Sequence, residues 1–243
     1  MITLIGVGHV FDIKRQVRDV IMGQMPSAVG VELDPGRYEA LIHPQQPRAM
    51  PITYRIMAKF QRRLAKELGG ELGGEMLSAV ETAKELGIPF LFIDADASVM
   101  FNKLMETMPI KERLLLALSA FAGFFASKKQ VETELENFTA NEEAYMKQFE
   151  RQFPTLKKAL IDDRNRLMAD NISMAEDTFG SVVAVIGDGH VDGIMHLLQG
   201  RQVQLVRLKQ LLDSSYPKGF VSTGKGGAEI SYQYTVADPE GNH

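Results

Sequence analysis

The amino-acid sequence predicts an α/β domain with a central, largely parallel sheet, two pseudo-symmetric βα halves and an inserted helical layer. Two observations lead to this fold class. Short apolar runs alternate with amphipathic stretches over much of the 243 residues, which is the pattern of βαβ units on a parallel sheet. In addition, nearly the same short segment follows an early and a late apolar run, as expected of two related halves.

The beginning of the chain reads as strand, helix and strand. Residues 2–7 form a β-rich run, residues 12–25 an amphipathic stretch and residues 28–33 a second apolar run. The crossover between the two runs makes their strands parallel. Asp34 followed by Pro35 then predicts a helix start, because aspartate is a good N-cap and proline suits the first turn.

The middle of the chain is predominantly helical. Residues 52–68 and 75–86 have helical patterns, and the second of these helices stops at Gly87, as helix ends prefer. A third strand covers residues 90–93. The block 98–179 contains no strand-like run, so it predicts three or four helices that form the inserted helical layer.

The end of the chain returns to strands. The last elements of the domain are a strand, a helix and a strand, over residues 182–186, 191–198 and 202–208. Together these elements predict one α/β domain over residues 1–213. The Gly-rich tail, residues 214–243, has a strand-like run at 228–236 that predicts an edge strand or a dimer contact.

Composition excludes several classes of protein. Lys and Arg number 27 against 31 Asp and Glu, a net charge of -4, so there is no basic excess to neutralise nucleic-acid phosphates. Cysteine is absent, which excludes a disulfide scaffold, a cysteine-based zinc site, an iron–sulfur cluster and a cysteine nucleophile.

Hydropathy predicts a protein without a membrane span. The longest apolar run, residues 114–126, falls short of the roughly 20 residues that a helix needs to cross a bilayer. The N-terminus has no basic region of a secretory signal, so we expect a cytoplasmic protein. The same apolar run is hard to bury in a single layer of helices, which predicts a homodimer.

Two segments carry a GxxH motif after a strand. Five of six residues are identical between Ile5-Gly6-Val7-Gly8-His9-Val10 and Ile186-Gly187-Asp188-Gly189-His190-Val191. Glycines at these turns let the backbone approach a ligand closely, so Gly6, Gly8, Gly187 and Gly189 are candidate ligand-binding positions. A histidine at the start of a helix is favoured in its neutral form, which a metal ligand or a general base requires.

Polar side chains follow several predicted strands directly. Glu32 ends the second strand, Asp94 follows the third, and His9 and His190 follow the first and fourth. If the first two strands are neighbours, about 4.8 Å apart, His9 and Glu32 converge on one pocket. A purely structural glycine turn with a polar cap is the alternative, although two copies and a strand-end glutamate make it less favoured. The GxGxxG pattern is incomplete, which argues against a dinucleotide site.

The ordered set of motifs resembles the TraB/PrgY family of pheromone-shutdown proteins, whose clan includes the TIKI and GumN-like proteins. The matching segments are Gly6-Val7-Gly8-His9, Val31-Glu32-Leu33-Asp34 with Arg37-Tyr38 and Leu41, Asp163-Arg164-Asn165 with Met168-Ala169, and Gly187-Asp188-Gly189-His190-Val191 with Gly193-Ile194. The resemblance implies an α/β fold whose site lies at the two GxxH turns, the strand-two glutamate and the helical Arg164. Family members often carry arginine where this chain has Ala95, which puts one pocket cation in doubt.

The resulting functional hypothesis is a metal-dependent, peptidase-like hydrolase that acts on a peptide or a small substrate. TIKI relatives are described as metal-dependent proteases, and microbial members are thought to inactivate or capture peptide pheromones. His9, Glu32 and His190 are the candidate metal ligands, with one of them alternatively a base or an orienting group. Without cysteine the ligands are nitrogen and oxygen atoms, which suit Mn, Co or Zn. Arg164 would bind a substrate carboxylate or an oxyanion.

Two other functions remain open at this point. The first is a non-catalytic protein that binds and sequesters a peptide or a porphyrin. The second is a metal-free, esterase-like hydrolase that uses histidine as its base.

Overall fold

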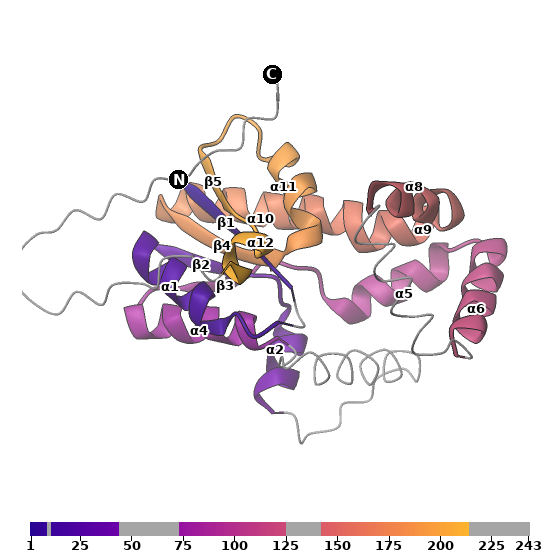
Figure 1. The fold of residues 1–243 in the computed structure, drawn as a ribbon, viewed down its shortest axis with the longest axis horizontal. Coiled ribbons are helices and arrows are strands. Elements are labelled where there is room, and N and C mark those ends of the chain that lie inside the picture. Colours follow the sequence, from indigo (N-terminus) through magenta and orange to yellow (C-terminus); the bar gives the residue numbers. More distant parts are fainter. Residues whose placement is uncertain (9–10, 44–72, 125–141, 214–243) are drawn as a thin grey trace, which may run out of the picture.

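The computed structural model describes residues 1–8, 11–43, 73–124 and 142–213. Within these ranges the fold is α/β, as predicted. Figure 1 shows a sheet covered by helices on both faces, with a group of further helices to one side of it. The predicted helix at 52–68 and the predicted tail strand at 228–236 lie outside the described residues, and the tail's role stays a prediction.

Over the described residues the sheet has five strands, all parallel, in the order β3-β2-β4-β1-β5. The strands are β1 (Ile2–Val7), β2 (Ala28–Val31), β3 (Phe90–Phe92), β4 (Val182–Gly187) and β5 (Val203–Val206). Each coincides with a predicted strand, although β2, β3 and β5 are shorter than the apolar runs that predicted them.

The first two strands are not neighbours, so the condition under which His9 and Glu32 would follow adjacent strands is not met. β4 lies between β1 and β2, because Val182 at its start is in register with Ile2 on one side and with Ala28 on the other. Every residue of β4 is buried, as expected of a strand with a partner on each side and a helical layer on each face. A segment from late in the sequence therefore separates the two earliest strands.

Most of the described helices lie in predicted helical segments, but the last one was not predicted and begins at Leu208, where the predicted strand 202–208 ends. The helices are α1 (Lys14–Gln24), α2 (Pro35–Ile42), α4 (Gly74–Leu86), α5 (Ala97–Thr107), α6 (Ile110–Phe124), α8 (Glu142–Gln152), α9 (Pro154–Lys157), α10 (Asp163–Phe179), α11 (Val191–Leu197) and α12 (Leu208–Leu212). A π-helical turn, η1 (Lys158–Asp162), joins α9 to α10, and a 3-10 turn, η2 (Asp188–His190), joins β4 to α11.

Successive side chains of the strands point to opposite faces of the sheet and pack into two hydrophobic cores. On one face of the sheet, Ile5 of β1 and Val185 of β4 pack with side chains of α1 and α4. On the other face, Leu4 and Ile186 pack with Met168 and its neighbours on α10 and with side chains of α11. Burial on both faces explains why the strands read as continuous apolar runs rather than as alternating patterns.

The inserted helical layer lies beside the sheet. Figure 1 shows α5, α6, α8 and α9 grouped at one side, with α10 extending from this group across the sheet. Leu104, Met108, Phe153 and Leu156 form a small core of their own within this group. Each described helix is too short or too polar to cross a membrane.

Candidate functional site

Three neighbouring strand ends bring polar side chains together at the carboxyl edge of the sheet. Because β3, β2 and β4 are adjacent and parallel, the residues that follow them, Asp94, Glu32 and His190, emerge at the same edge. Backbone pairing continues one residue beyond β2, where the Glu32 N–H donates to the carbonyl of Val185 at 3.0 Å. Open parallel sheets bind ligands at this edge.

Glu32 is the centre of the cluster and is only 3% exposed. Its Oε2 accepts a hydrogen bond of 2.5 Å from the backbone N–H of Gly187, at the end of the neighbouring strand. Its Oε1 accepts from Nη2 of Arg164 and lies 3.5 Å from Nε2 of His190. A buried carboxylate needs such partners, and the apolar strand before Glu32 provides none of them.

Asp94 lies between two guanidinium groups. Arg164 binds it through Nε to Oδ1 at 3.0 Å and through Nη2 to Oδ2 at 2.7 Å, and Arg37 donates to Oδ2 from the other side. Burial by itself would raise the pKa of Asp94. The hydrogen bonds and positive charges of Arg164 and Arg37 outweigh burial and hold this pKa below its ordinary value.

Arg37 reaches Asp94 from the first turn of α2. Asp34 caps this helix by accepting from the Arg37 N–H at 2.9 Å, and its second oxygen accepts from Arg37 Nε at 2.6 Å. The one-turn spacing of Asp34 and Arg37 fixes this pair locally, and the remaining end of the guanidinium points to Asp94. Asp94 therefore has two cationic partners, Arg37 and Arg164.

Arg164 enters the cluster from the first turn of α10, directly after the π-helical turn η1. The π turn accommodates one additional residue in a continuous helix, so it rotates α10 relative to α9. This rotation turns Arg164 toward the sheet edge. Burial alone would lower the pKa of Arg164, but bonding and charge from Asp94 and Glu32 raise it, so the guanidinium stays charged.

One N–H of Arg164 remains available. Its Nε and Nη2 groups are directed to Asp94 and Glu32, while Nη1 makes one bond of 3.3 Å to the Leu160 carbonyl. Since Nη1 carries two hydrogens, one has no acceptor among the residues that the structure describes.

His190 is oriented by Asn165. Its Nδ1 lies 2.7 Å from Oδ1 of Asn165, and because that carbonyl oxygen accepts, Nδ1 is the protonated nitrogen. When the ring is protonated, its Nε2–H faces Oε1 of Glu32, 3.5 Å away. Gly193 permits this arrangement, because a Cβ at that position would clash with the Asn165 amide.

The structure brings Glu32, Arg164 and His190 together, and it adds residues to which the sequence assigned no role. His9 lies outside the described residues, so its convergence with Glu32 and His190 stays a prediction. Arg37 and Asn165 were present in the matched motifs, but only their tertiary neighbours show that they position the site. The spacing of one helical turn between Asp34 and Arg37 was the sequence feature that could have indicated a role for Arg37.

The four candidate glycines have different surroundings. Gly187 contributes its N–H to Glu32. A Cβ at Gly6 would clash with Asp188, and one at Gly8 would meet Leu208 and Phe11, so both positions need the small residue for packing. A Cβ at Gly189 would meet nothing within 4 Å. Ligand binding by these glycines stays a prediction.

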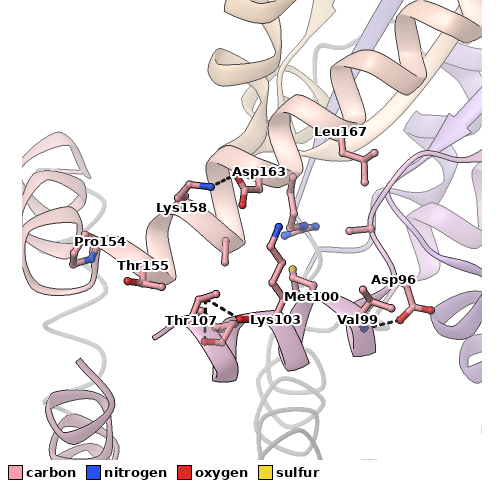
Figure 2. A pocket seen from close by; sticks show the side chains of 14 residues that line it. Asp96, Val99, Met100, Lys103, Thr107, Pro154, Thr155, Lys158, Asp163 and Leu167 are labelled. Carbon is pink, nitrogen blue, oxygen red and sulfur yellow. Dashed lines mark hydrogen bonds and ion pairs between the residues drawn. The ribbon is translucent and has the colours of Figure 1, made fainter. Parts of the chain in front are cut away.

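A cavity of about 740 Å³ lies next to the cluster, between α5 and the helix formed by α9, η1 and α10 (Figure 2). Arg164 belongs both to its lining and to the acidic cluster, whereas Glu32 and His190 do not line it. Arg164 thus contacts both the cavity and the buried carboxylates.

The described residues supply two of the three predicted ligands of a divalent metal. The described residues contain no group of three His, Asp or Glu side chains arranged to hold a metal, and the third expected ligand, His9, is not among them. The other two fit. Two ligand atoms on one tetrahedral metal lie roughly 3.4 Å apart at ordinary bond lengths, close to the 3.5 Å between Glu32 Oε1 and His190 Nε2. Asn165 is hydrogen-bonded to Nδ1 of His190, and metal-bound histidines commonly make such a bond with their second ring nitrogen.

The protein is an α/β domain that has helices on both faces of its sheet and a cluster of acidic, arginine and histidine side chains at the carboxyl edge of that sheet. The sequence model of the TraB/PrgY/gumN family matches residues 1–205, and the chain belongs to this family. An uncharacterized protein of Methanocaldococcus jannaschii is 29% identical over 224 residues, covering 85% of this chain and 56% of the relative. The chain therefore spans little more than half the length of that relative.

Proposed function

We propose that this protein is a hydrolase of the peptidase type, in which Glu32, His190 and Arg164 act on a peptide or a small substrate. The observation that carries the proposal is the fixed pairing of Glu32 with His190. Nε2 of His190 lies 3.5 Å from an oxygen of this buried carboxylate, and Nδ1 of the same ring is hydrogen-bonded to Asn165. In such a pair the histidine nitrogen can take up a proton, and the neighbouring carboxylate stabilises the charged ring.

His190 would act as the base. Its Nε2 would take a proton from the attacking water and later return it to the leaving group, while the negative charge of Glu32 stabilises the protonated ring. Arg164 would supply its remaining Nη1–H to the carbonyl oxygen on which negative charge develops. Asp94 and Arg37 would keep Arg164 in place, so that no reorganisation is needed during the reaction.

A divalent metal, Mn, Co or Zn, is part of the proposal. Glu32 and His190 would hold it, with His9 as the third donor. In that form Nε2 of His190 would be a ligand and not the base, and the metal would act as a Lewis acid that makes water more acidic. We propose a cytoplasmic location and a homodimer as well. The dimer is supported by the apolar side chains of α6, since Ile110, Leu114 and Leu118 are each more than half exposed.

A metal-free hydrolase is the second candidate, and one observation favours it. Oε1 of Glu32, the oxygen closest to His190, already accepts from the guanidinium of Arg164. A cation bound to the same oxygen would lie beside this positive charge and would be repelled by it. In this alternative the carboxylate orients His190 directly, and hydrolysis needs no metal.

Hydrolysis of a fluorogenic peptide and ester library tests the proposal. Glu32→Gln and His190→Ala should reduce turnover by at least about a hundredfold, the usual contribution of a positioned acid or base. Glu106→Gln and His196→Ala, on exposed positions of α5 and α11, are the matched controls. Turnover retained in both site variants would refute the proposal and favour a binding protein.

Metal dependence is decided by a separate measurement. Elemental analysis of the purified protein and activity after exhaustive chelation should show a stoichiometric metal and a loss of turnover that added Mn, Co or Zn restores. Full activity of the chelated protein, still abolished by Glu32→Gln, would instead establish the metal-free hydrolase.

A further inference from the structure

The cavity beside the cluster has an apolar wall and a polar wall. Val99, Met100 and Leu104 of α5 contribute apolar side chains, and Leu167 of α10 adds another. Its volume of about 740 Å³ is within the range of pockets that hold small ligands. Because Arg164 lines the same space, a molecule bound here would lie against the guanidinium that also contacts Glu32.

Among the described residues, the charged side chains of the lining other than Lys103 each have an ion-pair or hydrogen-bond partner. Lys158 forms an ion pair of 2.6 Å with Asp163, and Arg164 is paired with the buried carboxylates. Asp96 accepts from two backbone N–H groups at the start of α5, at 2.8 and 3.0 Å.

Lys103 differs from these groups. Its ammonium has no carboxylate partner among the residues that the structure describes. Figure 2 shows its side chain extending from α5 into the space below the opposite helix.

We propose that this cavity binds a substrate that has an apolar body and a free carboxylate, and that Lys103 is the residue that binds the carboxylate. The inference rests on the proposed hydrolase function, because it assigns the substrate class of the same site. A single ammonium matches the single charge of a carboxylate. A phosphate would require several donors.

The position of Arg164 determines the orientation in which the substrate would bind. With its carboxylate on Lys103 and its apolar body against Val99 and Met100, the substrate would direct its scissile carbonyl to the remaining Nη1–H of Arg164. Lys103 is therefore a specificity-determining residue, which selects for a charged end and takes no part in bond cleavage.

Equilibrium binding tests the inference without turnover. The probe is 11-(dansylamino)undecanoic acid, which joins a carboxylate to an apolar chain, compared with its primary amide by dansyl fluorescence. The wild-type protein should bind the acid about fivefold more tightly than the amide, as expected of one partly exposed ion pair. Lys103→Met should abolish this preference, and Lys103→Arg should retain it.

Further variants serve as controls. Lys209→Met, which removes an exposed lysine on α12 outside the cavity, should leave the preference unchanged. Val99→Asp places a negative charge in the lining at a side chain that is 66% exposed, so it should weaken binding of the acid more than that of the amide. Equal affinities of wild-type protein for acid and amide, or an acid preference that survives in Lys103→Met, would overturn the inference.

Failure of this inference can be distinguished from failure of the proposed function. Glu32 does not line the cavity, so Glu32→Gln should retain the preference for the acid over the amide while it loses turnover. Turnover that depends on Glu32, together with no role for Lys103, would refute only the substrate class. An acid preference that depends on Lys103, without Glu32-dependent turnover, would refute the hydrolase and leave a carboxylate-binding protein.

Discussion

Replacing Asp94 by asparagine tests whether the arginine cluster holds the site together. Asp94 is the only side chain among those described that contacts both Arg37 and Arg164, and its carboxylate is 1% exposed. Asparagine keeps the size and one acceptor oxygen but removes the negative charge between the two guanidinium groups. The substitution therefore isolates the electrostatic contribution.

The structure gives an approximate magnitude. Breaking a buried ion pair by removing one partner costs about 3–5 kcal/mol of the free energy of unfolding. Each guanidinium keeps another carboxylate, since Asp34 still pairs with Arg37 and Glu32 with Arg164. We therefore expect a smaller loss, about 2–3 kcal/mol, which lowers the melting temperature of a chain of this size by roughly 4–12 °C.

The pH dependence has a defined sign. The two arginines hold the pKa of Asp94 in the folded protein below its ordinary value of 3.8, which applies in the unfolded chain. The stabilisation is therefore complete above the unfolded pKa and is lost as the pH falls through the folded pKa. The difference in unfolding free energy between wild type and Asp94→Asn should be constant from about pH 7 to pH 5 and should narrow below about pH 4.

Urea unfolding followed by circular dichroism at several pH values measures both quantities. Asp170→Asn, at an exposed position of α10, is the control and should change stability by less than about 0.5 kcal/mol. An Asp94→Asn protein as stable as wild type at pH 7, or a stability difference that does not narrow at low pH, would show that the arginine cluster contributes no charge-dependent stability.

Two further predictions concern other parts of the molecule. Gly193→Val should displace the Asn165 amide from its place beside Gly193 and free the ring of His190, so turnover should fall at least about tenfold while circular dichroism retains the α/β signature; unchanged turnover would mean that Asn165 does not position His190. Light scattering should give twice the 27.0 kDa chain mass, and Leu114→Glu together with Leu118→Glu on α6 should restore the monomer; a monomeric wild-type protein at high concentration would refute the dimer.

The sequence was sufficient to locate the elements, because their signals are local. Asp34 and Pro35 begin α2, Asp34 caps it with its own side chain, and Gly87 ends α4 in a left-handed conformation with a φ of 67°. The strands were visible as apolar runs, and a glutamate at the end of such a run indicated a buried polar group. These features depend on neighbours within a few residues.

Strand order depended on the tertiary structure. A strand buried on both faces is apolar throughout, so its sequence does not specify which strand lies beside it. For this reason the placement of β4 between β1 and β2 could not be predicted, and the sequence analysis could treat adjacency of the first two strands only as a condition. Once β4 is in place, the Gly187 N–H lies beside Glu32, a contact between residues far apart in the sequence.

The ion-pair network of the site also required the tertiary structure. The pair of Asp34 and Arg37 follows from their spacing of one helical turn, but its extension through Asp94 to Arg164 joins three separate elements. The direction of Arg164 depends on the π turn before α10, for which the sequence has no recognised pattern. The sequence alone determined which chemical groups are available at the sheet edge. Their pairing was decided by packing, because a buried charge takes the opposite charge that the fold places within reach.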